Sequence, residues 1–285
     1  MIEMLIKPKR AQRRPWELFF IGLFYASVSF LLVTYVFRAD DILRDGSGLL
    51  LVIFTVICCL PFVYYIIKLE EGKDLEIDDS GKLIKEHAKA LHALMWLFLG
   101  LVVAFAFWYI ILPDSAPQNF NFQIKTFCAI NSPTNYELCI ENYGIAPLTT
   151  AAVSSKVFLS IFSNNISVLI FTILFSLVFG AGAMFILVWN ASVIAAAMGI
   201  FAKGELSQIP ASLFRYMLHG VPEIAAYFIG ALAGGIISVA IIRRDLVGEK
   251  KWLILQDAVL LVIIAVVILI IAGLMEVYLT PMFFR

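Results

Sequence analysis

Charged residues are scarce in this 285-residue sequence, at 15% of the total, and they sum to a net charge of zero. A soluble domain usually carries about 25% charged and 45–50% apolar residues. Here hydrophobic residues reach 62%, more than a soluble fold of this size could cover with polar groups. The composition therefore excludes an ordinary soluble domain. A net charge of zero also gives no general attraction to nucleic acid.

Familiar enzyme signatures are missing as well. The sequence has no H-E-x-x-H zinc motif, no G-x-S-x-G nucleophile turn and no phosphate-binding P-loop. It contains three histidines, and His87 and His92 are expected to lie far from His219. A zinc site needs three or four ligands, so His219 with Glu223 does not predict one. We expect no catalytic activity, no metal site and no cofactor.

Long apolar runs are what the sequence has in abundance. Each is about as long as the roughly 20 residues that a helix needs to cross a bilayer. Backbone polar groups must be satisfied within the chain in lipid, so each run predicts a helix. The six runs are Trp16–Phe37, Leu49–Ile67, Leu91–Leu112, Ile166–Val188, Val221–Ile242 and Leu255–Leu279. The first is too long for a cleaved signal peptide and is expected to be retained. The fold class is an all-α polytopic transmembrane helical bundle.

The stretch from Ile166 to Ala202 carries no charge and is too long for one crossing. A single helix would be about 55 Å long, against a hydrocarbon core of about 30 Å. We predict a helix break at Asn190, because asparagine often caps helices. Residues 191–202 would then form a short seventh crossing. The alternative is a re-entrant hairpin over residues 190–219, which leaves six crossings.

A second break is predicted between Gly220 and Pro222. Pro210 suits the first turn of a short helix, and Gly220 suits its C-terminal end. Pro222 would then open the next full span at its first turn. In this interpretation a short amphipathic helix is followed by a separate membrane span.

Lysine and arginine in short loops predict the orientation, since they favour the cytoplasmic side. The N-terminal tail, the 68–89 loop and the 243–251 loop are basic, whereas the 38–48 loop is not. We therefore expect a cell-membrane protein with a cytoplasmic N-terminus and an external C-terminus. Residues 113–165 would form an external loop.

Two cysteines, Cys128 and Cys139, fall in this external loop. An oxidising compartment favours a disulfide between them. The alternative is a pair of free, partly buried thiols.

Polar residues near the outer ends of the spans form the main candidate site. They are Asn164, Asn165, His219, Glu223 and Glu276, which share one expected membrane depth. Ionisable residues in membrane spans commonly mark functional sites. The cluster could shape a cavity or bind a cation or a headgroup. The structural interpretation is that these residues cap helices or satisfy helix dipoles.

Small residues recur in the later spans and include the spacing Gly230-x-x-x-Gly234. This spacing lets membrane helices approach closely. It is compatible with packing inside one chain and with a homo-oligomer.

Several separated motifs resemble the stage II sporulation protein M family. They are FLSIFSNNISVLIFTILFSLVFGAGAMFILVWN over Phe158–Asn190 and LHGVPEIAAYFIGALAGG over Leu218–Gly235. The resemblance covers about Leu91–Arg285. It divides the chain into residues 1–90, a basic tail with two spans and a cytoplasmic loop, and residues 91–285, the family-like membrane domain. The two extra spans resemble an extension seen in archaeal-type members.

The resemblance implies a membrane partner of a complex that, in sporulating members, recruits a cell-wall hydrolase. We therefore expect a non-catalytic membrane scaffold that contacts lipids and membrane or cell-envelope proteins. The alternative is a transporter or channel with a polar cavity near the outer membrane face.

Overall fold

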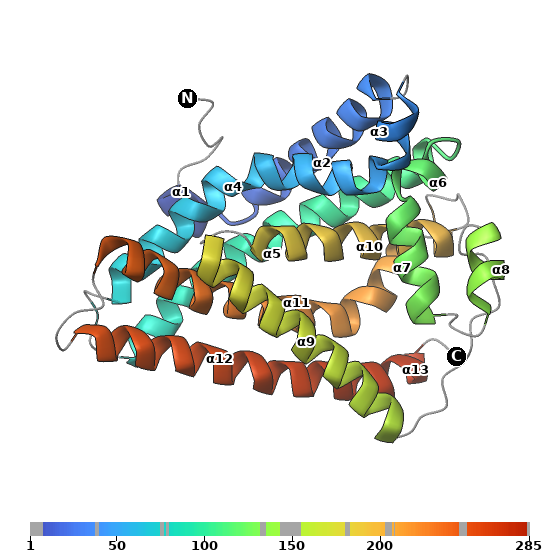
Figure 1. Cartoon of the computed structure of the whole chain (residues 1–285). Coiled ribbons are helices and arrows are strands. Elements are labelled where there is room, and N and C mark those ends of the chain that lie inside the picture. Colours follow the sequence, from blue (N-terminus) through green and yellow to red (C-terminus); the bar gives the residue numbers. More distant parts are fainter. Residues whose placement is uncertain are drawn as a thin grey trace.

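The computed structural model describes residues 8–37, 40–74, 77, 80–131, 135–142, 155–179, 183–202, 207, 209–244 and 250–283. Within these ranges all regular structure is helical, as predicted. The elements are α1 (Pro8–Arg13), α2 (Glu17–Val36), α3 (Asp41–Asp45), α4 (Ser47–Asp74), α5 (Ser80–Ile111), α6 (Ala116–Asn119), α7 (Asn121–Asn131), α8 (Tyr136–Glu141), α9 (Ser155–Phe179), α10 (Met184–Ala202), α11 (Ile209–Arg243), α12 (Lys250–Leu274), the π-helical turn η4 (Met275–Leu279) and α13 (Thr280–Phe283). Seven of them, α2, α4, α5, α9, α10, α11 and α12, are long and apolar enough to cross a membrane (Figure 1).

Two of the spanning helices continue well beyond the apolar runs. The 32 residues of α5 make a helix of about 48 Å, which exceeds a hydrocarbon core of about 30 Å. The C-terminal part of α4 and the N-terminal part of α5 extend past the same end of the bundle. Most of the basic segment after the second span is therefore helical rather than a loop.

Side-chain contacts show which helices run in the same direction. On α9 and α11, a Cβ at Gly230 would meet Leu169, and the Ser176 hydroxyl lies 2.5 Å from the Ala231 carbonyl. The residue numbers rise together along both helices, so α9 and α11 are parallel. The helix between them, α10, must carry the chain back from one end of the bundle to the other. This geometry agrees with seven crossings and contradicts a re-entrant hairpin over residues 190–219.

The sequence predicted a helix break at Asn190, and this prediction is wrong. Asn190 lies inside α10, and its Nδ2 donates to the Ile186 carbonyl at 2.7 Å, four residues earlier. The side chain thus uses a carbonyl of its own helix rather than capping a new one. Helix α9 ends at Phe179 and α10 begins at Met184, and the sequence between them contains two glycines, weak helix formers. As a result α9 begins and ends earlier than predicted, and α10 is a 19-residue helix.

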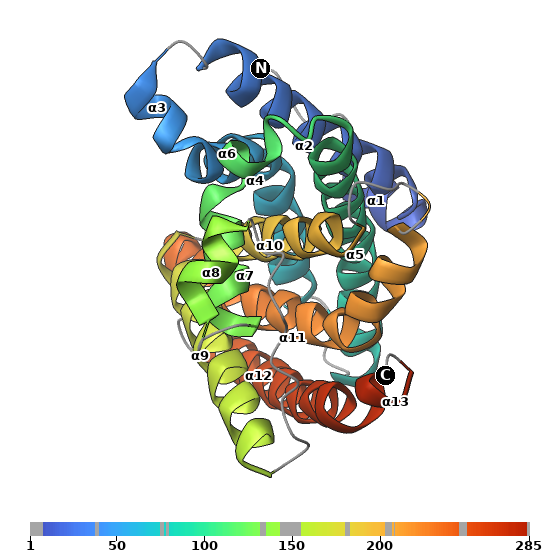
Figure 2. The ribbon, with the colours of Figure 1, turned by 90° about the vertical axis from the view of Figure 1, so that its right-hand side faces the viewer.

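The second predicted break is also wrong. Gly220 and Pro222 lie inside α11, which is one continuous helix of 35 residues. Proline removes one backbone donor, yet membrane helices tolerate it because neighbouring groups can satisfy the freed carbonyl. Figure 2 shows α11 between α10 and α12. His219 and Glu223 therefore occupy adjacent turns of one helix instead of facing each other across a break.

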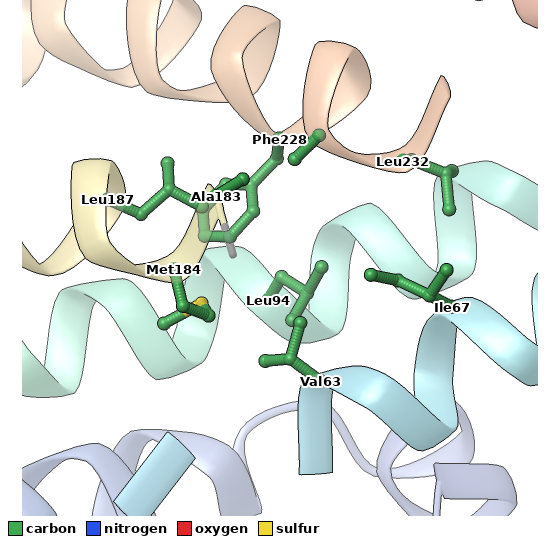
Figure 3. A pocket seen from close by; sticks show the side chains of 9 residues that line it. Val63, Ile67, Leu94, Ala183, Met184, Leu187, Phe228 and Leu232 are labelled. Atoms are coloured by element: carbon green, nitrogen blue, oxygen red, sulfur yellow. The ribbon is translucent and has the colours of Figure 1, made fainter. Parts of the chain in front are cut away.

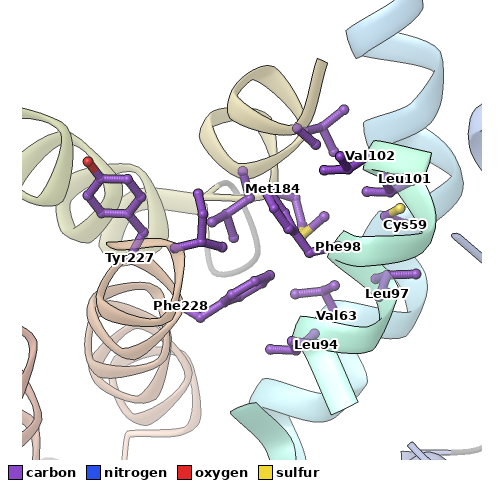
Figure 4. Packing of buried hydrophobic residues seen from close by; sticks show 14 of the residues in the cluster. Cys59, Val63, Leu94, Leu97, Phe98, Leu101, Val102, Met184, Tyr227 and Phe228 are labelled. Atoms are coloured by element: carbon purple, nitrogen blue, oxygen red, sulfur yellow. The ribbon is translucent and has the colours of Figure 1, made fainter. Parts of the chain in front are cut away.

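The core lies where α4, α5, α10 and α11 meet (Figure 4). Phe98 of α5 and Phe228 of α11 meet edge to face with centroids 6.2 Å apart. Close approach to α9 requires Gly234, because a Cβ there would lie 2.5 Å from the Ile173 carbonyl oxygen. The small residues of α11 thus serve packing inside the chain.

The bundle has two chemically different ends (Figure 1). We call the one with α1, the end of α4, the start of α5 and the end of α11 the basic end. The other, the cap end, carries α6, α7 and α8, which we call the cap, together with α13. Figure 2 looks onto the cap end, where α7 and α8 lie in front of the spans. The described parts of the N- and C-terminal regions, α1 and α13, lie at opposite ends, as an odd number of crossings requires.

Candidate functional site

The candidate polar residues lie on three helices that pack together at the cap end. Asn164 and Asn165 are on α9, His219 and Glu223 are on α11, and Glu276 is in η4. The helix α11 contacts α9, α12 and η4. The sequence therefore identified residues on neighbouring elements, although it placed several of them at helix ends.

His219 and Glu223 use different hydrogen-bond partners. His219 Nδ1 lies 3.2 Å from Thr280 Oγ1 at the start of α13. The Tyr227 hydroxyl donates to Glu223 Oε1 at 2.7 Å, one turn along α11. Figure 4 shows the Tyr227 hydroxyl pointing away from the apolar core around Phe228. The histidine thus joins α11 to the C-terminal helix, and the tyrosine holds the glutamate against its own helix.

Glu276 lies in the π-helical turn that continues α12. Its carboxylate is close enough to that of Glu223 for the two charges to interact. Two ionised carboxylates that interact in this way repel each other. Single π-helical turns often occur at functional sites. This pair is the most unusual part of the cluster.

The two asparagines have unequal environments. Asn165 is buried whereas Asn164 is exposed, and Asn164 Nδ2 lies 3.5 Å from Asn165 Oδ1. Both are inside α9, in its third turn, so neither caps the helix. Because α9 is parallel to α11 with Leu169 beside Gly230, Asn165 lies at about the level of Tyr227.

The cap is attached to the spans by amide side chains. Asn119 donates to Thr34 at 2.7 Å, and Gln123 donates to the Gly48 carbonyl at 3.0 Å and to Ser192 at 3.1 Å. These bonds join the cap to α2, α4 and α10. The described part of the predicted external loop before α9, residues 113–131 and 135–142, is thus folded, and its contacts with the spans are defined.

The predicted disulfide is present in the structure. Cys128 on α7 is bonded to Cys139 on α8, with the two Cα atoms 5.7 Å apart. Both cysteines are fully buried and contribute to the core. The bond fixes the two longest described helical segments of the cap to each other.

A small cavity lies among α4, α5, α10 and α11 (Figure 3). Its volume is about 20 Å³, room for about one water molecule. Its lining is apolar and includes Val63, Met184 and Phe228. An apolar cavity of this size offers no polar partners to a ligand.

The family comparison covers most of the spans. Stage II sporulation protein M matches residues 93–281. The chain belongs to this family. No curated protein and no solved structure matches the chain. The cap and the whole polar cluster fall inside the family region, whereas α1, α2, α3 and α4 precede it.

A buried polar network at the basic end was missed by the sequence analysis. Glu70 is fully buried and accepts from Gln12 at 2.5 Å and Lys73 at 2.8 Å. Its second oxygen lies 2.9 Å from His87 Nδ1. These side chains come from α1, α4 and α5. The signal was available in part, since Glu70 and Lys73 have helical i,i+3 spacing.

One ion pair joins the preceding helices directly to the family region. Glu71 at the end of α4 is fully buried and binds Arg243 at the end of α11. A buried carboxylate needs such a partner, because taking an isolated charge out of water is costly. The N-terminal helices are therefore integrated with the family region rather than appended to it.

Proposed function

We propose that the protein is a non-catalytic scaffold of the cell membrane that binds membrane or cell-envelope proteins through the cap. The observation that carries the proposal is the attachment of the cap to three spans by amide hydrogen bonds and its closure by the Cys128–Cys139 disulfide. A binding surface of this kind is held in one shape, which lowers the entropy lost on association.

The outer surface of the cap supports this role. Leu138 on α8 is 48% exposed, and Phe122 on α7 is also exposed beside Lys125, whose Nζ lies 5.6 Å from the ring centroid. Exposed aromatic side chains such as Phe122 are enriched in protein interfaces. The spans beneath the cap present apolar side chains, as expected for contact with lipid.

A photo-crosslinking amino acid at Leu138 tests the proposal in native membranes. The matched control is Ile263 of α12, which is 55% exposed on a membrane span. We expect a protein adduct of defined mass at position 138 and none at position 263. The adduct should weaken when both cap cysteines are changed to serine. Adducts of equal yield at both positions, or none at 138, would overturn the proposal.

A transporter or channel is the second candidate, motivated by the neighbouring carboxylates of Glu223 and Glu276. The apolar lining of the cavity in Figure 3 favours the scaffold. Ion flux into vesicles containing the purified protein separates the two candidates. Flux that is lost in Glu223→Gln, with no cap adduct in membranes, would favour the transporter.

A further inference from the structure

Four cationic side chains among the described residues line an open concavity at the basic end. Lys9, Arg10, Arg13 and Arg14 line a space of about 590 Å³ on α1 and the turn that follows it. All four side chains are exposed. We propose that this concavity binds the headgroup of an anionic phospholipid from the adjacent leaflet.

The concavity keeps an excess of positive charge. Among the described residues, Glu17 is the acid that pairs with it, at 2.9 Å from Arg10 Nε and 3.5 Å from Arg14 Nη1. Within the part of the chain that the structure describes, one carboxylate against four cations leaves a formal charge of three. Guanidinium groups bind phosphate oxygens with paired hydrogen bonds, and lysine adds a point charge. The chemistry therefore suits a phosphate-bearing headgroup.

The cationic face is held in place by the rest of the bundle. Ala11 is fully buried, and Gln12 donates to Glu70 and accepts from Lys73 Nζ at 3.2 Å. These contacts turn one side of α1 toward α4, and they leave the four cationic side chains on the outside. The buried network at the basic end thus orients the concavity.

Two aromatic residues place the concavity at headgroup depth. Trp16 and Phe20 are 52% and 58% exposed, and their rings meet edge to face with centroids 6.0 Å apart. They lie at the start of the α2 span, immediately after the four cations. Exposed tryptophan beside a span commonly lies at the membrane–water interface. Basic clusters directly beside a span attract anionic lipids.

Position favours lipid over other anions. A nucleic acid would require a cationic surface away from the bilayer. The last of the four cations, Arg14, is within one helical turn of the apolar span that begins at Glu17. Lipid binding at this concavity is independent of the scaffold function, because the concavity is at the opposite end from the cap.

The test is native mass spectrometry of the full chain in detergent, titrated with phosphatidylglycerol or with phosphatidylcholine. We expect phosphatidylglycerol to bind preferentially. The double variant Lys9→Gln/Arg13→Gln removes the two cations that do not pair with Glu17. Since each basic residue near an anionic lipid surface contributes about 1 kcal/mol, we expect it to weaken binding by about tenfold or more.

The matched control is Lys82→Gln/Lys85→Gln, which removes the same charge from exposed positions of α5 at the same end. It should retain wild-type affinity, and Lys9→Arg/Arg13→Lys should too. An equal loss of phosphatidylglycerol affinity in both glutamine variants would indicate a general electrostatic attraction to the basic end, and it would overturn the proposed site. Equal binding of the two lipids would also overturn it. Inorganic phosphate that competes at the same concentration as the lipid would contradict a lipid site. The thermal transition of each variant verifies folding.

Discussion

Glu71 of α4 and Arg243 of α11 form an ion pair that connects the helices preceding the family region to the last turn of its longest helix. Glu71 is fully buried, whereas Arg243 is partly exposed. The carboxylate is therefore the member of the pair that depends on its partner. Arg243 lies inside the region that matches the family, whereas its partner Glu71 lies before that region.

Replacing Arg243 with glutamine should destabilise the protein by about 3 kcal/mol, because it leaves a buried carboxylate without its cation. The double variant Glu71→Leu/Arg243→Leu should lose less stability than Arg243→Gln, because it leaves no unpaired buried charge. The measurement is thermal unfolding in detergent. Control variant Arg244→Gln changes the neighbouring exposed arginine and should leave the transition unchanged. An unchanged transition in Arg243→Gln would show that the pair contributes little.

Glycines of α11 should respond differently to alanine. In Gly234→Ala the new Cβ would meet the Ile173 carbonyl oxygen at 2.5 Å. We therefore expect overpacking to lower the free energy of unfolding by about 1–3 kcal/mol. In Gly220→Ala the Cβ meets nothing within 4 Å, and alanine favours the helix by about 1 kcal/mol. Gly220→Ala should therefore be neutral or stabilising. A destabilised Gly220→Ala would argue that the chain bends there, as the sequence first suggested.

Apolar runs identified the spanning helices because lipid requires each of them to satisfy its own backbone. The helix boundaries were harder to predict. Within the uncharged stretch no polar residue marks the break, and Asn190 is compatible with a helix interior because its amide can bond the Ile186 carbonyl. Proline is a strong stop signal in water, but Pro222 lies within a packed membrane helix.

The sequence indicates which residues of the spans are ionisable, but not which side chains they contact. Glu223, His219 and Glu276 stand out because charge is rare in the spans. Their partners, Tyr227 and Thr280, carry no such signal. The sequence does not predict the network around Glu70, because the charged residues after the second span are typical of a solvated loop. Only the helical extension of α4 and α5 brings Glu70 to His87.

Tyr227→Phe removes the donor to Glu223 while keeping the ring in place. We expect a loss of about 1 kcal/mol, because a carboxylate oxygen in a mostly apolar setting loses its hydrogen bond. Glu223→Gln should not be destabilising, since it also removes repulsion from Glu276. Thermal unfolding of the two single variants is the measurement. A transition that is unchanged in Tyr227→Phe would contradict a stabilising Tyr227–Glu223 hydrogen bond.

The orientation of the bundle is the last prediction. Seven crossings place the two chain ends on opposite sides, and the parallel arrangement of α9 and α11 requires the α10 crossing. Basic residues concentrate at the end with α1 and Arg243, which predicts that this end is cytoplasmic. A reporter that is active only outside the cytoplasm, fused after Arg285, should therefore be active. The same reporter inserted between Gly81 and Lys82 should be silent. Activity at the internal position and silence at the C-terminus would invert the orientation, and silence at both would contradict the odd number of crossings.

Inverted orientation would also place the disulfide-bonded cap in a reducing compartment, where a bridge between Cys128 and Cys139 is not expected to persist. Mass mapping of that bridge in membranes therefore gives an independent measurement of the same orientation.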